Sequence, residues 1–132
     1  MGNGQLITEQ GKLIAFNRLW NSIPTYSSPS VFKVGTGTTT PNISDTDLAS
    51  AITISGNPTK AFLASYPYLE ELTLNSTVRA VLLTTECNSS SITEFGIFNT
   101  DGTNKCFSRA VFTAITKTNT VQVIFLEKDK II

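Results

Sequence analysis

The sequence predicts a mainly β protein, an antiparallel β-sandwich with an N-terminal α-helix. Runs of β-branched and aromatic residues fill much of the chain after residue 30, and an Asp-Gly pair divides two of them. A helical spacing of apolar residues marks the N-terminal part. At 132 residues the chain has the size of one domain, so we expect residues 1–132 to form a single unit. Within it we expect an N-terminal helical segment at 1–23 and a β-domain at 30–132.

The N-terminal helix is expected over residues 5–20. Leu6, Leu13 and Trp20 follow one another at a seven-residue spacing, which is typical of one apolar face of a helix. Thr8 can instead cap a shorter helix that begins at the next residue. The apolar face suits either docking on another chain or packing on the protein's own sheet.

The middle of the chain is expected to be short in regular structure. Prolines and serines at 24–29 predict a connector, and 30–34 predicts a strand that leads into a glycine-containing loop at 35–41. Asp47 follows Ser44 by three residues, as in a capping box, which predicts the start of a short helix there.

Further strands are predicted in the rest of the chain, where β-branched and aromatic residues recur. They are expected at 61–66, at 77–86, in both arms of a hairpin within 92–115, and at 120–127. The loop 116–119 is expected to join the second hairpin arm to the last strand as a meander.

The hairpin prediction depends on Asp101-Gly102, because a two-residue type I′ turn requires positive φ at both central positions. The facing pairs are then Ile92 with Val111, Glu94 with Arg109, and Phe98 with Lys105. A cross-strand pair of opposite charges stabilises by roughly 0.2–1 kcal/mol, so we expect Glu94 and Arg109 to form a structural ion pair.

Catalytic chemistry is not indicated. The chain has no histidine, which excludes Ser–His and Cys–His nucleophile pairs. The Gly35-Thr36-Gly37 loop lacks the Lys-Ser/Thr of a phosphate-binding loop, and a helix cap explains the acids Asp45 and Asp47 better than a metal site does. Cys87 and Cys106 are expected to be free thiols. From these observations together we expect no enzyme activity, no cofactor and no metal.

Charge and hydropathy narrow the partners. Ten acidic and ten basic residues give zero formal net charge, whereas phosphate binding relies on an excess of Lys and Arg. We therefore expect no nucleic acid partner. No apolar run approaches the roughly 18–20 residues of a membrane span, and no secretory signal is recognisable, so we expect no membrane span and a cytosolic site of synthesis.

Three motifs resemble a recurrent module of tailed-bacteriophage virion proteins. The run Glu94-Phe95-Gly96-Ile97-Phe98, then Asp101-Gly102, Arg109 and Phe112, is similar to that family's E-x-G-(L/I)-F segment, glycine turn, arginine and aromatic. Upstream, the stretch 34–41 and the run Asp45-Thr46-Asp47-Leu48 resemble its G-x-G-x-x-x-P and D-T-x-L segments. The stretch 6–11 resembles its usual opening before a helix.

The resemblance implies a structural virion component of the tail, baseplate or fibre-attachment region. It also implies a homo-oligomeric adaptor that contacts other phage virion proteins, located in the virion and assembled in the cytoplasm of the host bacterium. We expect the docking residues to lie in 1–23 and at the C-terminal end. They are Leu6, Leu13, Trp20, Ile131 and Ile132.

Two alternatives remain open at this point. The first is a capsid-decorating or head-fibre base protein, which belongs to the same structural class. The second is a carbohydrate-binding module that contacts host surface glycans through stacked aromatic rings. Its candidate residues are Trp20, Tyr26, Tyr66 and Tyr68.

Overall fold

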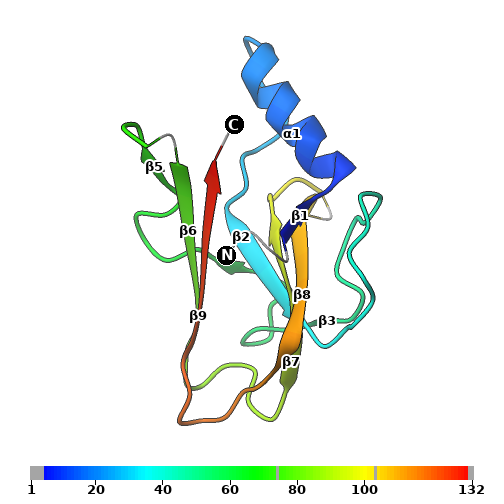
Figure 1. Cartoon of the computed structure of the whole chain (residues 1–132), viewed down its shortest axis with the longest axis vertical. Helices are drawn as coiled ribbons and strands as arrows, with labels where there is room; N and C mark the ends of the chain where they lie inside the picture. The colour runs from blue at the N-terminus through cyan, green and yellow to red at the C-terminus, as the bar shows by residue number, and fades with distance from the viewer. Residues whose placement is uncertain (1–4, 74, 103, 131–132) are drawn as a thin grey trace.

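The chain folds into two antiparallel β-sheets and a helix near the N-terminus (Figure 1). This computed structural model describes residues 5–73, 75–102 and 104–130. The sheets face each other across a hydrophobic core, so the predicted antiparallel sandwich with an N-terminal helix is confirmed.

The strands divide unequally between the sheets. The larger sheet contains β1 (Gln5–Ile7), β2 (Val31–Gly35), β3 (Ala51–Ile52), β4 (Lys60–Ala61), β7 (Ser91–Phe98) and β8 (Cys106–Thr116). Its order is β1-β8-β7-β2-β3, with β4 also paired to β2. The smaller sheet contains β5 (Tyr68–Glu70), β6 (Asn75–Leu82) and β9 (Val123–Lys130), in the order β5-β6-β9.

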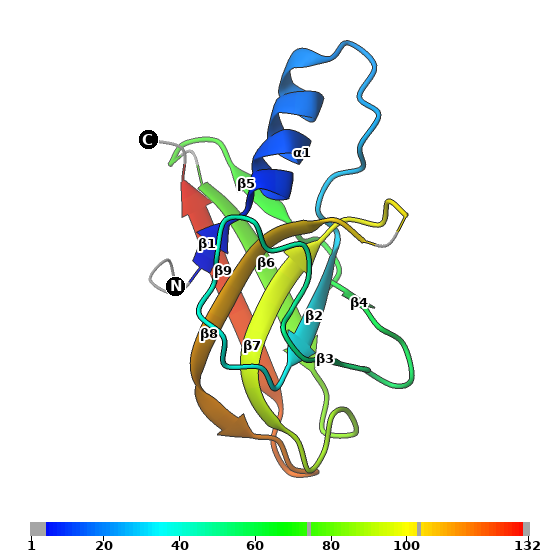
Figure 2. The same ribbon diagram turned by 90° about the vertical axis from the view of Figure 1, so that its right-hand side faces the viewer.

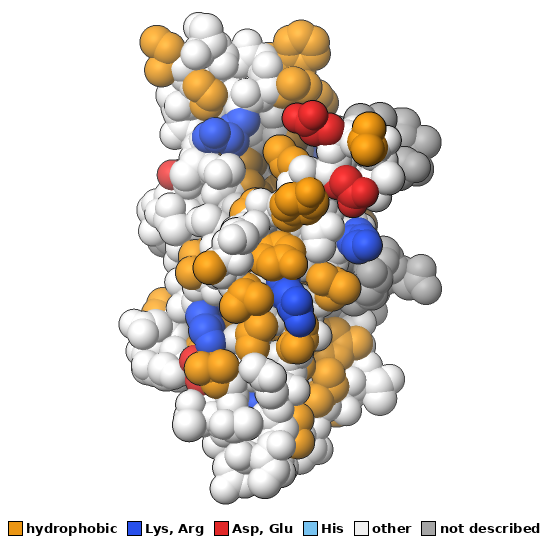
Figure 3. Space-filling model, turned by 90° about the vertical axis from the view of Figure 1, so that its left-hand side faces the viewer, with side chains coloured by type: hydrophobic (Ala, Val, Ile, Leu, Met, Phe, Trp, Pro, Cys, Tyr) orange, Lys and Arg blue, Asp and Glu red, His pale blue; other side chains and the backbone are white. Residues whose placement is uncertain are grey.

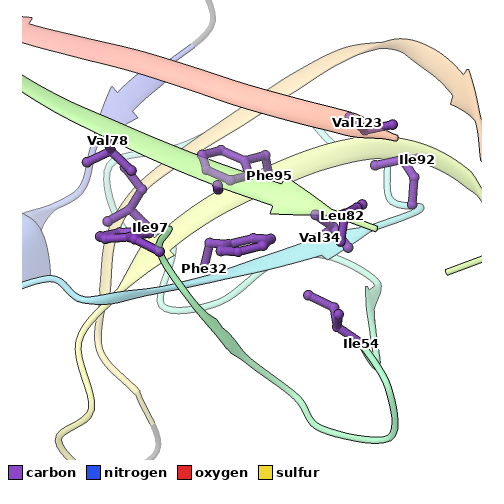
Figure 4. Packing of buried hydrophobic residues seen from close by; sticks show 11 residues of the cluster. Phe32, Val34, Ile54, Val78, Leu82, Ile92, Phe95, Ile97 and Val123 are labelled. Carbon is purple, nitrogen blue, oxygen red and sulfur yellow. The ribbon is translucent and has the colours of Figure 1, made fainter. Parts of the chain in front are cut away.

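Apolar side chains from both sheets fill the space between them (Figure 4). Phe32 and Phe95 come from the larger sheet, and they share one buried cluster with Val78 and Leu82 of the smaller sheet. The Phe95 ring stacks on Phe125 with centroids 4.5 Å apart. Burial of one such side chain stabilises by about 1.5–3 kcal/mol, so this cluster holds the two sheets together.

The larger sheet is also covered on its outer face. The β2–β3 loop, residues 36–50, passes in front of β7 and β8 (Figure 2). Because side chains alternate along a strand, the residues of β7 that do not face the core lie beneath this loop. The outer side of β7 carries Glu94, Gly96 and Phe98, and all three are buried.

The last strand departs from the predicted meander. β9 pairs with β6 along its whole length, from Asn75 opposite Lys130 to Leu82 opposite Val123, and it does not continue the sheet of β8. Residues 117–122 therefore cross from one sheet to the other. The meander prediction is wrong because an alternating strand reveals which side is buried but not which neighbour it pairs with.

The helix follows the shorter of the two expectations. α1 spans Glu9–Trp20, and the Thr8 hydroxyl at its N-cap accepts a hydrogen bond from the Gly11 N–H at 3.0 Å. Residues 5–7 form β1 beside β8 instead of helix. Leu6 therefore lies in a strand, and the seven-residue apolar series does not form one helical face.

α1 is held on one side and free on the other. Ile14 is 1% exposed, and a Cβ at Gly11 would collide with the carbonyl oxygen of Phe107 in β8. Leu13 and Trp20 point to solvent, and α1 projects beyond the end of the sheets (Figures 1 and 2). With 12 residues it is short, and no helix in the described ranges is long and apolar enough to cross a membrane.

Three predicted elements between residues 44 and 86 differ from the structure. Residues 44–47 form no helix, because Asp45 accepts from the Asn42 N–H at 2.8 Å and closes a turn. The strand predicted at 61–66 is limited to β4, which ends at Ala61. The strand predicted at 77–86 is β6, which begins and ends earlier than predicted.

Candidate functional site, a buried ion-pair centre

The hairpin of β7 and β8 has a longer loop than the sequence predicts. Asn99 N–H donates to the carbonyl oxygen of Lys105 at 3.1 Å, and a turn inside this loop is closed by Asn104 N–H on Asp101 at 2.8 Å. Gly102 and Asn104 have φ of 52° and 69°. The predicted two-residue turn at Asp101-Gly102 is therefore wrong, although Gly102 does adopt the left-handed conformation.

Side chains within the loop cause this difference. The buried Asn99 accepts from the N–H groups of Asp101 at 3.1 Å and Lys105 at 2.9 Å through Oδ1. Asp101 in turn accepts from the N–H of Ser27 at 2.8 Å and from its hydroxyl at 3.0 Å. The loop thus binds the connector that precedes β2, a contact no local turn rule predicts.

The longer loop shifts the strand register by two residues. Glu94 faces Val111, and Gly96 faces Arg109, so the predicted facing of Glu94 and Arg109 is wrong. The two charged side chains nevertheless lie on one face, because a shift of two residues preserves the side of the sheet. Arg109 donates to Glu94 Oε1 from Nη2 at 3.0 Å and from Nε at 3.2 Å, so the ion pair itself is confirmed.

Glu94 is the acceptor at the middle of this centre, and it is 0% exposed. Its Oε2 accepts from the N–H groups of Gly37 at 2.9 Å and Ser50 at 2.7 Å. Its Oε1 accepts from the Ala49 N–H at 2.9 Å as well as from Arg109. One carboxylate thus binds both ends of the β2–β3 loop.

The protonation state of Glu94 follows from these donors. Burial alone would raise its pKa, but the N–H groups of Ser50 and Ala49, the Arg109 side chain and the Gly37 N–H together hold the pKa below its ordinary value. Glu94 therefore remains a carboxylate at neutral pH.

Arg109 binds the middle of the same loop, and it is 1% exposed. Its Nη1 donates to Asp45 Oδ2 at 2.9 Å, and its Nη2 donates to the carbonyl oxygen of Thr39 at 2.8 Å. A planar guanidinium can make such divergent contacts, whereas a lysine ammonium cannot reproduce them. The two buried charges together therefore hold the β2–β3 loop at its ends and in its middle.

The glycines near the centre are required by close approach. A Cβ at Gly35 or Gly37 would lie 2.5 Å from Glu94 Oε2. A Cβ at Gly96 would lie 2.9 Å from Leu48 Cδ2. The motifs that sequence inspection singled out separately, G-x-G, D-T-x-L and E-x-G with its arginine, thus meet in one place.

Two further ion pairs were not identified from the sequence. Lys33 donates to Asp47 at 3.0 Å, and its ammonium lies 4.6 Å from the centroid of the Phe98 ring. Lys60 of β4 donates to Glu86 at 2.6 Å, beyond the end of β6. No sequence signal pairs these residues, because 14 and 26 positions separate the partners.

The charged side chains of this centre bind the protein's own groups. Neither Glu94 nor Arg109 reaches solvent. Asp45 forms an ion pair with Arg109, and Asp47 forms one with Lys33. Burial raises the pKa of the Cys106 thiol to about 12, so this group is a poor nucleophile. Within 5–73, 75–102 and 104–130, no group of three or more His, Cys, Asp and Glu side chains could hold a metal ion.

The expected docking residues lie in different environments. Leu6 is half-buried in β1, while Leu13 and Trp20 are exposed on α1. Ile131 and Ile132 lie outside the described residues. Sequence reasoning did not include Phe16 and Leu19, which are also exposed on α1.

The aromatic residues proposed for sugar stacking serve separate contacts. Tyr66 packs against the core, and the Tyr26 ring lies 5.4 Å from the ammonium of Lys105. Tyr68 lies on β5 and Trp20 at the end of α1. No contact in the described chain joins these four rings into one stacking surface.

Two hollows lie outside the ion-pair centre. One, of about 540 Å³, lies between β8 and β9 and is lined mainly by phenylalanine and isoleucine. The other, of about 510 Å³, lies on the outer face of the smaller sheet and is lined by residues 60–64 together with Arg79, Val81, Leu83, Gln122 and Ile124. Both are lined mostly by apolar side chains, which suits contact with another apolar surface.

Comparisons of the chain with protein-family models, curated proteins and solved structures found no match.

Proposed function

We propose that this chain is a structural, non-enzymatic component of a tailed-bacteriophage virion. In this proposal it is an adaptor of the tail, baseplate or fibre-attachment region, and it acts by self-association and by docking to neighbouring virion proteins. Its location is then the virion, after assembly in the host bacterial cytoplasm.

The observation that carries the proposal is the convergence of the motif residues. Glu94, Arg109, Asp45 and the glycines Gly35 and Gly37 carry the resemblance to phage virion proteins, and they form one buried centre. The motif residues hold the framework of the fold, and neither charge of the central pair is open to solvent. This arrangement suits a protein that acts by presenting a rigid surface to its partners.

The surface of the protein also supports an adaptor role. Large apolar side chains are exposed on α1 and on the smaller sheet, and the formal net charge is zero. Exposed apolar side chains that gather on one face mark contacts with other proteins. An adaptor covers such surfaces when it is assembled.

The proposal is tested on particles purified from a culture that produces the chain. After washing at high salt, quantitative mass spectrometry is expected to find the chain at a fixed ratio to the major capsid protein. Gold-labelled antibody is expected at the tail or its tip. Labelling over the head would support the capsid-decorating or head-fibre alternative, and absence from washed particles would exclude both.

Two helix variants sharpen this test. Trp20→Glu places a charge on the exposed apolar side of α1 and is expected to prevent incorporation of an otherwise folded chain. Ala15→Glu, on another side of the same helix, is the matched control and is expected to be incorporated normally. Binding of the purified chain to a glycan array, lost in a Tyr68→Ala variant, would instead favour the carbohydrate-binding alternative.

A further inference from the structure

The outer face of the smaller sheet is apolar and open. Figure 3 shows hydrophobic side chains gathered there, with basic side chains among them. The hollow of about 510 Å³ on this face is surrounded by side chains of residues 60–64, of β6 and of the segment that begins β9. The large exposed ones are Leu63, Leu83 and Ile124, with Leu126 farther along β9.

The side chain of Arg79 places a basic group on this face. Arg79 of β6 lines the hollow, and its Nε is shielded from solvent but has no hydrogen-bond partner within the described residues. Leaving a buried donor unsatisfied is unfavourable, and it is more so for a charged group. A carboxylate from an incoming surface would form an ion pair with the guanidinium of Arg79, which is half-buried in a single copy.

A matching surface exists on α1. Leu13, Phe16 and Trp20 recur at intervals of three and four residues, so they form one stripe, and all are exposed. Glu9 precedes Leu13 by one turn on the same stripe, and its carboxylate forms no ion pair within 5–73, 75–102 and 104–130. The stripe therefore combines apolar side chains with one free acid.

We propose that the α1 stripe of one copy docks on the outer face of the smaller sheet of a second copy, with Glu9 directed to Arg79. This inference rests on the self-association part of the proposed function.

Three properties favour a second copy as the occupant. The stripe and the sheet face are both apolar and exposed, and each carries the charge that the other lacks. The helix cannot serve its own smaller sheet, because Gly11 and Ile14 hold it over β8 of the larger sheet. The lengths also fit, since the 12 residues of α1 extend about 18 Å and the 8 residues of β6 about 27 Å.

A contact between two different patches has a consequence for assembly. It leaves one free helix and one free sheet face on each dimer, so it continues into a closed ring or a filament unless two copies exchange both contacts. Self-association by this route therefore depends on both surfaces in every copy.

The test uses one variant for each surface and measures mass by sedimentation velocity. Phe16→Glu alters the stripe and Ile124→Glu alters the sheet face, and both positions are exposed in a single copy. Each variant alone is expected to lose self-association, by at least about tenfold in affinity. An equimolar mixture is expected to form a dimer, because each variant retains the surface that the other has lost.

The charge pair provides a second measurement. Glu9→Lys and Arg79→Glu are each expected to weaken self-association, and the double variant is expected to recover it. Glu71→Lys, an equal change of charge on an exposed turn outside the hollow, is the matched control and should associate like the unaltered chain. Circular dichroism confirms that every variant is folded.

The inference is overturned if the folded variants do not dimerise in the mixture, or if either variant associates like the unaltered chain. A chain that is monomeric alone but present in particles would refute this inference and leave the virion proposal standing. A chain that associates as described but is absent from particles would do the reverse.

Discussion

The two sheets of the sandwich share one core but differ on their outer faces. The outer face of the larger sheet is covered by the β2–β3 loop, which Glu94 and Arg109 hold in place. The outer face of the smaller sheet has no comparable cover in the described chain and exposes leucine and isoleucine side chains. The first face is thus completed within the chain, whereas the second is suited to completion by another chain.

The difference arises from the kind of residue that each sheet directs outward. β7 and β8 direct a carboxylate and a guanidinium outward, and these charges can be buried only where a loop supplies hydrogen bonds. β9 directs Ile124 and Leu126 outward, and these need no hydrogen-bond partner. Burial of charge therefore requires a specific cover, whereas an apolar face accepts any complementary apolar surface.

The largest expected effect is at the covered face. Glu94→Ala leaves Arg109 buried with reduced compensation and leaves the N–H groups of Gly37, Ala49 and Ser50 without their acceptor. Removing one partner of a buried ion pair destabilises by about 3–5 kcal/mol, and we expect a loss in this range. Urea denaturation followed by circular dichroism measures it.

The control for this variant is Glu71→Ala, which removes an exposed acid and is expected to change the free energy of unfolding by less than about 0.5 kcal/mol. If Glu94→Ala does not fold, Arg109→Lys is used, because it keeps the charge and loses the planar contacts. Unfolding of either centre variant at the urea concentration of the unaltered chain would show that the loop does not depend on the ion pair.

The next effect concerns the space beneath the loop. Gly37→Ala places a Cβ 2.5 Å from Glu94 Oε2 and 2.6 Å from the Cβ of Ala49, so the loop must move. Overpacking of a buried site costs typically about 1–3 kcal/mol, and we expect a destabilisation in this range. Thermal or urea unfolding measures it, and Thr36→Ala at the neighbouring exposed position should be nearly neutral.

Acid sensitivity is expected from two carboxyl groups. For Glu86, burial would raise the pKa, but Lys60, the N–H of Leu83 and the Ser55 hydroxyl lower it overall, as the donors around Glu94 do there. Both pKa values are lower in the folded state, so the unfolded chain binds more protons as the pH falls below the ordinary value of 4.5. The stabilisation is complete above that pH and is lost as the pH falls through the folded pKa values.

Urea midpoints measured across acidic pH test this prediction. Glu86→Gln cannot titrate, so we expect its stability to fall less steeply below pH 4.5 than that of the unaltered chain. Equal slopes for the two proteins would show that Glu86 has the same pKa in the folded and unfolded states.

Some of this arrangement is predictable from the sequence, and the reason is local chemistry. The Thr8 cap, the β-rich composition and the pairing of Glu94 with Arg109 follow from residue type and short spacing. The hairpin register failed because Asn99 and Asp101 bind groups outside a two-residue turn. The helix expected at 44–47 failed because Asp45 accepts from the Asn42 N–H and closes a turn, and no local rule shows that Asp45 also binds Arg109, 64 positions away.

The partner of β9 was unpredictable for a similar reason. Its alternating apolar residues suit pairing with β8 or with β6 equally well, and only the packing of the whole core selects β6. The openness of the smaller sheet depends on this pairing, so the comparison between the two outer faces could not be made from the sequence.

The smallest expected effect on stability is at the open face. Ile124→Thr and Leu126→Thr replace side chains that are 45% and 49% exposed, on a strand that threonine also favours. For the monomer, we expect each change in the free energy of unfolding to stay within about 0.5 kcal/mol, because both are surface positions where nearly half of the side chain already contacts water. Self-association should nevertheless weaken in both variants. Substitutions at the covered face are thus expected to lower stability, whereas substitutions at the open face are expected to weaken self-association.

Urea denaturation at a protein concentration too low for association measures the stability of the monomer, and sedimentation velocity at a higher concentration measures self-association. A loss of more than about 1 kcal/mol in the dilute monomer would contradict the prediction, since surface positions away from special features rarely cost so much. It would mean that the face is covered by the chain's own residues.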